Sequence, residues 1–280
     1  MSGPTTVADV ASARTLLFVP GDRPERFAKA AVSGADVVVD LEDAVAPEAK
    51  EAARAEVVNW FAEGGVGIVR VNAPDTSWFE DDVAALAPHV DVVLMPKAHD
   101  PHAVSELVDT LRRQRPDAGV LALIETASGL IAAPAIAAVD GVVRLAFGNF
   151  DLGTELGVDP DDRDTLRSLR TQLVVASAAA GLPSPVDGVS GAIDDAAAID
   201  ADTRDARRGG YGAKLCIHPR QVPVVAAALA PSEEQVAWAR RIVAVWETTT
   251  SGAVALDGTM VDKPVVDRAR RVLRAADVTN

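Results

Sequence analysis

The strongest constraint on the fold is a regular alternation of short strand-like runs with helical segments. Runs rich in Val, Ile and Leu occur eight times, at 15–19, 36–41, 67–71, 90–95, 120–124, 142–147, 185–189 and 213–217. Ala-, Glu- and Arg-rich segments with helical spacing lie between them, for example at 48–61 and 103–113. This alternation predicts βαβ units and a parallel sheet. Eight units favour an α/β fold closed as a (β/α)8 TIM barrel over an open, doubly wound sheet.

The composition limits both the core and the partners of the chain. Hydrophobic residues make up 49% of the 280 residues but aromatic residues only 4%, so the core rests on aliphatic side chains, as in sheets covered by helices. The net charge of −14 argues against nucleic acid or an anionic membrane surface as a partner. Cys216 is the single cysteine, so an internal disulfide is excluded.

Three regions are predicted along the chain. Residues 1–13 look like a loose N-terminal tail without the features of a signal peptide, and with no long apolar run we expect a cytoplasmic protein without membrane contact. Residues 14–230 hold the barrel and its active site. Residues 231–280 exceed what a barrel needs and form a C-terminal helical and lid extension. Ser232 and Gln235 predict a capping box for a helix over 232–247, a hairpin is expected around Asp257 and Gly258, and a last helix from Pro264.

Charged and polar residues follow the ends of nearly all the predicted strands. In a barrel these ends meet at one mouth, where such enzymes keep their chemistry, whereas turns also attract polar residues for reasons unrelated to function. The strand-end residues are Arg23, Glu42, Arg70, Lys97, Glu125, Asp151, Asp187 and His218.

Glu125 and Asp151 follow two consecutive strands, so the barrel brings both carboxylates to the same mouth. Oxygen ligands from two carboxylates suit a hard cation that keeps open positions for water and substrate, and we therefore expect Mg2+. The alternative is a pair of ordinary rim carboxylates.

With these residues in place, the chain resembles the HpcH/HpaI aldolase and citrate lyase β-subunit superfamily, and within it the CoA-ester lyases of the citramalyl-CoA and malyl-CoA lyase type. The resemblance spans about residues 14 to 275. The matching segments are LFVPG at 17–21, PER at 24–26, DLEDAV at 40–45, RVN at 70–72, PK at 96–97, ETA at 125–127, Gly148 with DL at 151–152, IHPRQ at 217–221 and GTMVD at 258–262. One departure is Asn149-Phe150 before the metal-binding Asp, where Phe150 is expected to narrow the acyl pocket.

The resemblance implies roles for individual residues. Glu125 and Asp151 hold Mg2+, and Arg70 binds the carboxylate of the substrate, unless it is a structural partner of Asp40, Glu42 or Asp43. We expect Glu42 to be the neighbouring carboxylate closest to the metal. The resemblance also implies a homotrimer or hexamer in which the C-terminal segment crosses to a neighbouring subunit and supplies Asp262 as the acid or base at the acetyl carbon. The alternative is that Asp262 caps the last helix.

CoA carries several phosphate charges and therefore needs local cations on an acidic protein. The candidates cluster in sequence around the first and fourth strands, and they are Arg14, Arg23, Arg26, Lys29 and Lys97. A solvated charged helix over 23–29 is the alternative for the first group. For Lys97 an anion-binding or structural role is favoured over a Schiff base.

The expected function is a Mg2+-dependent carbon–carbon lyase. It would cleave citramalyl-CoA, malyl-CoA or citryl-CoA reversibly into acetyl-CoA and pyruvate, glyoxylate or oxaloacetate. Four alternatives stay open: the β subunit of a multi-subunit citrate lyase acting on an acyl-carrier partner, a malate-synthase-type or thioesterase enzyme using the same site, a CoA-independent aldolase, and a barrel kept as an assembly or binding subunit without catalysis.

Overall fold

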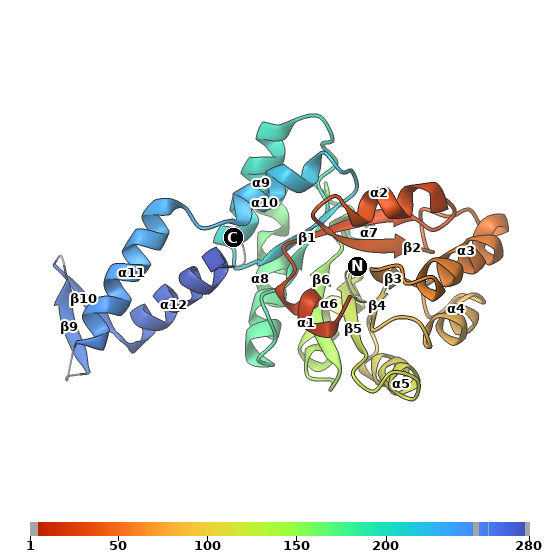
Figure 1. The fold of residues 1–280 in the computed structure, drawn as a ribbon, viewed down its shortest axis with the longest axis horizontal. Coiled ribbons are helices and arrows are strands. Elements are labelled where there is room, and N and C mark those ends of the chain that lie inside the picture. Colours follow the sequence, from red (N-terminus) through yellow and green to blue (C-terminus); the bar gives the residue numbers. More distant parts are fainter. Residues whose placement is uncertain (1–4, 249–251, 257, 278–280) are drawn as a thin grey trace. The chain divides into compact units, whose positions relative to one another are not determined.

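A closed barrel of eight parallel strands forms the larger of two units in the computed structural model, which describes residues 5–248, 252–256 and 258–277. The strands pair in chain order and β8 returns to β1, which confirms the predicted TIM barrel (Figure 1). Their bounds are β1 (Thr15–Pro20), β2 (Asp36–Asp40), β3 (Ile68–Arg70), β4 (Val92–Met95), β5 (Gly119–Ile124), β6 (Val142–Phe147), β7 (Val186–Asp187) and β8 (Ala213–Cys216).

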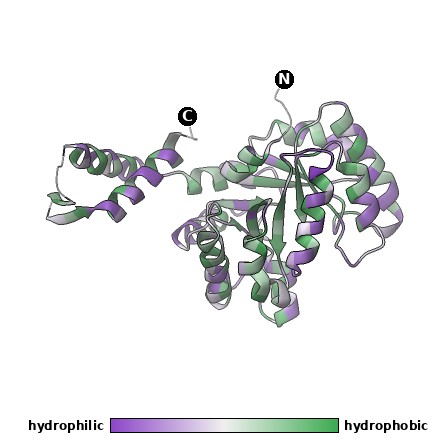
Figure 2. Cartoon of the chain, turned by 90° about the horizontal axis from the view of Figure 1, so that it is seen from below, coloured by the Kyte–Doolittle hydropathy of each residue, from purple (hydrophilic) through white to green (hydrophobic). Residues whose placement is uncertain are grey.

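Helices follow the strands and cover the barrel. They are α2 (Phe27–Ala31), α3 (Lys50–Ala62), α4 (Phe79–Leu86), α5 (Pro101–Arg112), α6 (Ala127–Ala137), α7 (Asn149–Leu156), α8 (Arg163–Ala179), α9 (Ala196–Arg208) and α10 (Gln221–Leu229). In α5 the buried residues are Val104, Leu107, Val108 and Leu111, the spacing of one helical face, and Asp100 caps its first turn. Figure 2 shows the same division, with apolar strands inside and polar helix faces outside.

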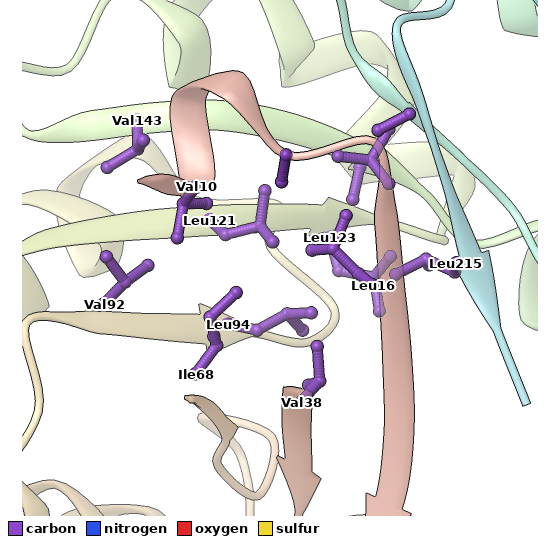
Figure 3. Close-up of a cluster of buried hydrophobic side chains, with 14 residues drawn as sticks. Val10, Leu16, Val38, Ile68, Val92, Leu94, Leu121, Leu123, Val143 and Leu215 are labelled. Carbon is purple, nitrogen blue, oxygen red and sulfur yellow. The ribbon is translucent and has the colours of Figure 1, made fainter. Parts of the chain in front are cut away.

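The interior of the barrel is filled by aliphatic side chains from inward-facing strand positions. Leu16, Val38, Ile68, Leu121 and Leu215 belong to one buried cluster, and Figure 3 shows them pointing toward one another from different strands. Successive residues of a strand point to opposite faces, so the interior residues recur at every second position. The barrel is therefore a solid core with its chemistry confined to the strand ends.

The N-terminal segment corrects the expectation of a loose tail. From Thr5 onward it is described, and it contains helix α1 (Val7–Ser12), closed by a capping box between Thr6 and Asp9. Val10 is fully buried in the interior cluster (Figure 3), and the guanidinium of Arg144 in β6 donates to the carbonyls of Val10 and Ala13. Because Arg144 lies near the start of its strand, α1 covers the end of the barrel opposite the mouth.

The smaller unit begins at Ala227, near the boundary predicted after residue 230. It contains α11 (Glu233–Glu247), with the predicted capping box of Ser232 and Gln235, the antiparallel strands β9 (Ala253–Leu256) and β10 (Thr259–Asp262), and α12 (Lys263–Asp277). Asp257, in the predicted turn, lies outside the described residues. The unit has its own apolar cluster, formed by Ala239, Ile242, Val261, Val266 and Ala269.

Within the described part of the chain, none of the helices combines the length and the apolar character that a bilayer-spanning segment requires.

Candidate active site

The two-residue period of the strands delivers three functional side chains to the mouth. Asp40 follows the interior residue Val38 by two positions, Arg70 follows Ile68, and Glu125 follows Leu123. They therefore share the inward face of the barrel with the core residues beneath them. Asp151 reaches the same end from the first turn of α7, which follows β6.

These residues line a cavity of about 380 Å³ at the mouth of the barrel. The polar residues that line it are Asp40, Asp43, Arg70, Glu125, Asn149 and Asp151, and the apolar ones include Phe18, Phe147, Phe150, Val189 and Ile217. The structure thus brings together Arg70 and the two carboxylates expected to bind Mg2+. Glu42 does not line this cavity, but its carboxylate contacts Arg70, which does, and Lys97.

Arg70 is held in a fixed orientation by carboxylates. Its Nε and Nη2 donate to the two oxygens of Asp40, each at 2.7 Å, and Nη1 lies 2.9 Å from Oε2 of Glu42. Its guanidinium also stacks 4.7 Å over the ring of Phe18. Burial lowers the pKa of Arg70, but the charge and hydrogen bonds of Asp40 outweigh this effect and raise it. Arg70 therefore forms the ion pairs that the structural alternative requires, and it also lines the cavity.

Glu125 is oriented by an unusual backbone at the end of β4. Lys97 adopts a left-handed conformation with φ of 49°, which is uncommon for a residue other than glycine. In this conformation the backbone N–H of Lys97 donates to Oε1 of Glu125 at 2.9 Å, while its Nζ donates to Oε1 of Glu42 at 3.2 Å. Gly148 is needed on the other side, because a Cβ there would lie 2.3 Å from Cβ of Glu125.

Lys50 supports the turn that carries Glu42, and sequence reasoning missed it. The ammonium is buried and donates to the carbonyls of Leu41 and Glu42, each at 2.7 Å. Burial lowers its pKa against the pull of the nearby carboxylates. The only signal in the sequence was a lysine at the start of a helix after a strand, which does not distinguish it from a surface lysine.

The mouth carries an excess of negative charge. Burial raises the pKa of Glu125 to about 8, and the charges of Glu42 and Asp151 add to this effect. Burial likewise raises the pKa of Glu42 to about 7, against the opposing charge of Arg70. Clustered carboxylates of this kind are a donor set whose negative charge a bound divalent cation compensates.

The carboxylates of Glu125 and Asp151 are therefore suitable ligands for Mg2+. Among the described residues no three His, Cys, Asp or Glu side chains form a ready metal cluster, so the chain would supply two carboxylates and leave the other positions to water and substrate. Mg2+ in proteins commonly keeps several waters in this way.

The cations proposed for CoA divide into four groups. Arg14 precedes β1 and so lies at the end of the barrel opposite the mouth, which removes it from the candidates. Arg23 and Arg26 follow β1 at the mouth end, with side chains 56% and 60% exposed beside Asp22 and Glu25. Lys97 is at the site itself. Lys29 is exposed on α2, and nothing in its surroundings distinguishes a phosphate contact from a solvated helix.

Two other strand-end residues do not face the cavity. Asp187, at the end of β7, pairs with Lys214 and Arg170, each at 2.7 Å, and lines a second cavity of about 220 Å³. His218 accepts a hydrogen bond from the backbone of Arg220. Their polar character is thus explained by local pairing.

Asp262 belongs to the smaller unit. Its Oδ1 accepts a hydrogen bond from the N–H of Val265 at 3.2 Å, in the first turn of α12, as the helix-capping alternative requires. A catalytic role for Asp262 stays a prediction.

Comparison with known proteins agrees with this architecture. The family described as HpcH/HpaI aldolase/citrate lyase matches residues 14–219. The chain is similar to a citrate lyase subunit beta-like protein of Mycobacterium tuberculosis, with 39% identity over 267 residues that cover 93% of this chain and 94% of the relative. It is also similar to a (3S)-malyl-CoA thioesterase of Cereibacter sphaeroides, with 34% identity over 94% of each chain.

Solved structures show the same likeness. Protein CitE from Mycobacterium tuberculosis, in complex with magnesium, acetoacetate and coenzyme A, matches with a TM-score of 0.82 and 39% identity over 95% of this chain and 99% of that chain. The closed barrel with a carboxylate-rich mouth places the chain in the broad class of TIM-barrel proteins, and the sequence match narrows this class to one family. The chain belongs to the HpcH/HpaI aldolase/citrate lyase family, and within it to the citrate lyase β-like enzymes.

Proposed function

We propose that this protein is a Mg2+-dependent carbon–carbon lyase that reversibly cleaves a short 3-hydroxyacyl-CoA thioester into acetyl-CoA and a keto acid. The observation that carries the proposal is the meeting of Glu125, Asp151 and Arg70 around one cavity. Solved structures from Mycobacterium tuberculosis contain magnesium with pyruvate in protein CitE and magnesium with oxaloacetate in a citrate lyase beta subunit, which supports the same cofactor and ligand class here.

Glu125 and Asp151 would hold the Mg2+ ion. When bound, Mg2+ polarises an oxygen of the substrate as a Lewis acid and orients the reacting fragment. The left-handed backbone of Lys97 fixes Glu125 for this task, and Gly148 leaves room for its side chain.

Arg70 would bind the free carboxylate of the substrate. Asp40 occupies Nε and one N–H of Nη2, and Oε2 of Glu42 lies 2.9 Å from Nη1, so the plane of the guanidinium is set and one N–H on each Nη would be left for a ligand. A guanidinium held in this way loses little conformational freedom when it binds a carboxylate.

The reaction requires two proton movements. The hydroxyl group loses its proton as the C2–C3 bond breaks, the electron pair of that bond remains on the thioester fragment, and C2 then gains a proton to give acetyl-CoA. Glu42, with a pKa near 7, is the carboxylate that we propose to accept the hydroxyl proton through a water molecule. Asp262, supplied by the C-terminal segment, would provide the proton at C2.

A thioesterase is the second candidate, because a relative with 34% identity carries that name. The same carboxylates and Arg70 would then bind the acyl thioester, and water would attack its carbonyl carbon. The two reactions differ in their products: a lyase releases acetyl-CoA and a keto acid, and a thioesterase releases free CoA and a hydroxy acid.

The test is to incubate the purified protein with Mg2+ and each of citramalyl-CoA, malyl-CoA and citryl-CoA, and to identify the products by mass spectrometry. Acetyl-CoA with the matching keto acid is the expected result. Free CoA without acetyl-CoA would establish the thioesterase instead. No turnover unless an acyl-carrier partner is added would identify a citrate lyase β subunit, and no turnover in either case would favour a binding subunit.

A further inference from the structure

The cavity at the mouth has two chemically different sides. The residues from β2, β3 and β5 are polar at the mouth, with Asp40, Arg70 and Glu125. The opposite side, from β6 round to β8 and β1, is apolar at most positions. Its apolar residues are Phe18, Phe147, Phe150, Val189, Leu215 and Ile217, and its polar residues are Asn149 and Asp151 of α7.

Part of the hydrophobic surface on the apolar side of the cavity is exposed. Phe150 is 38% exposed and Ile217 is 42% exposed, although both line the cavity. They follow β6 and β8, and Val189 follows β7 between them, so the three come from consecutive strand ends. A substrate group placed there removes this surface from water, and burial of apolar surface favours binding.

The same side offers few hydrogen-bond donors to an anion. Asn149 lines it, but its amide nitrogen already donates to the carbonyls of Pro160 and Val189, at 3.0 and 3.1 Å. Its buried Oδ1 packs against Gly188 and is an acceptor, so it adds no donor. Among the described residues that line the cavity, Arg70 is the single cation, and it lies on the polar side.

We infer that this cavity selects a thioester whose keto-acid fragment carries one carboxylate and one small apolar group, as in citramalyl-CoA, and that Phe150, Val189 and Ile217 are the specificity-determining residues. The inference rests on the proposed function and deepens it. The single carboxylate pairs with Arg70, and the apolar group contacts Phe150 and Ile217. Citryl-CoA has a second free carboxylate, which would lose water against an apolar surface without gaining a donor.

The three thioesters separate the contribution of the apolar group from that of the second carboxylate. Malyl-CoA has a hydrogen, and citryl-CoA a carboxylate-bearing group, where citramalyl-CoA has a methyl group. We expect kcat/KM for citramalyl-CoA to exceed that for malyl-CoA by about 10-fold, the usual effect of one methyl group in an apolar pocket. It should exceed that for citryl-CoA by at least about 100-fold, because a desolvated carboxylate is rejected more strongly. Equal or better cleavage of citryl-CoA would overturn the inference.

Variants test whether the named side chains set this preference. Ile217→Arg supplies a cation on the apolar side and should raise the citryl-CoA to citramalyl-CoA ratio of kcat/KM by about 10-fold or more. Phe150→Arg repeats the test from the neighbouring strand end if the first variant folds poorly. The matched control is Ile131→Arg on α6, which adds the same charge at a side chain that is 83% exposed and outside the cavity. Equal shifts in the control and in Ile217→Arg would contradict the assignment.

A binding measurement separates this inference from the reaction itself. Calorimetric titration of the protein in Mg2+ with pyruvate and with oxaloacetate reads the same preference without turnover. Absence of cleavage of all three thioesters would refute the lyase proposal, while tighter binding of pyruvate than of oxaloacetate, reversed by Ile217→Arg, would still support the apolar subsite. Tighter binding of oxaloacetate by the wild type would refute the subsite.

Discussion

At the scale of single residues, the site depends on charged groups that hold one another in place. Asp40 accepts four hydrogen bonds, two from Arg70 and two from the backbone N–H groups of Glu42 and Ala44. It therefore fixes the turn after β2 and the guanidinium together. Buried ion pairs of this kind contribute little net stability, but the loss of one partner leaves a charge unpaired.

Arg70→Lys should separate binding of the keto acid from binding of CoA. A lysine keeps the charge but cannot pair with Asp40 and a substrate carboxylate through several aligned N–H groups. In the condensation direction, KM for the keto acid should rise by about 10-fold or more, while KM for acetyl-CoA stays within about 2-fold. Equal increases in both constants would indicate that Arg70 is structural. Arg113→Lys, at the exposed C-cap position after α5, is the matched control.

At the scale of elements, the strands and the meeting of Glu125 with Asp151 at the mouth could be predicted from the sequence, whereas several local contacts could not. The predicted strands agree with the structure to within two residues at most ends, because buried aliphatic runs have clear limits. Glu125 and Asp151 could be predicted to meet because parallel strands end at the same mouth. The same rule places Arg14, which precedes β1, at the opposite end, so its assignment to CoA contradicted the fold.

Helix α1 is an element whose secondary structure depends on tertiary packing. Its six residues are too few to be stable alone, and the burial of Val10 against the barrel, together with the capping box, stabilises them as a helix. The pairing of Asp187 with Lys214 was equally hidden, because the two residues belong to different strands and nothing in their spacing links them.

The α1 end of the barrel also makes a pH-dependent contribution to stability. Burial raises the pKa of Asp36 at the start of β2 to about 6, and the charge of Asp9 on α1 adds to this, against Arg144. The folded state therefore holds the proton more tightly than the unfolded state. The stabilisation of the folded state by this bound proton is fully present below about pH 4 and is lost as the pH rises through about 6.

Asp36→Asn should remove this pH dependence. The free energy of unfolding of the variant, relative to wild type, should increase between about pH 4 and pH 6 and then level off at a gain of about 1–3 kcal/mol. Urea unfolding followed by circular dichroism at several pH values measures this difference. The exposed Asp117→Asn is the control, and a constant difference across the pH range would show that Asp36 is not responsible.

At the scale of the whole molecule, the two units divide the proposed chemistry between them. The barrel holds Glu125, Asp151 and Arg70, and the smaller unit holds Asp262. We propose a homotrimer or hexamer in which the smaller unit of one subunit completes the site of another. The helix-capping hydrogen bond from Val265 is accepted by Oδ1 of Asp262, so this contact does not use the other carboxylate oxygen.

Mixing two inactive variants tests this arrangement. Asp262→Asn should keep substrate and Mg2+ binding but lose turnover, and Glu125→Gln should also be inactive. Co-expression of the two should restore part of the activity, because mixed oligomers contain some sites with both native residues. No recovery in oligomers shown to be mixed would mean that Asp262 acts within its own chain or only caps α12.

The most direct measurement is the rate of thioester cleavage by wild-type and Glu125→Gln protein as Mg2+ is added after EDTA treatment. Wild-type turnover should rise from near zero to saturation with Mg2+. Glu125→Gln should need more Mg2+ and remain at least about 100-fold slower at saturation, since a metal ligand and its charge are lost. Glu63→Gln, at an exposed position after α3, should behave as the wild type. Full activity in excess EDTA, or an unchanged Mg2+ response in Glu125→Gln, would contradict the metal site at the centre of the proposed mechanism.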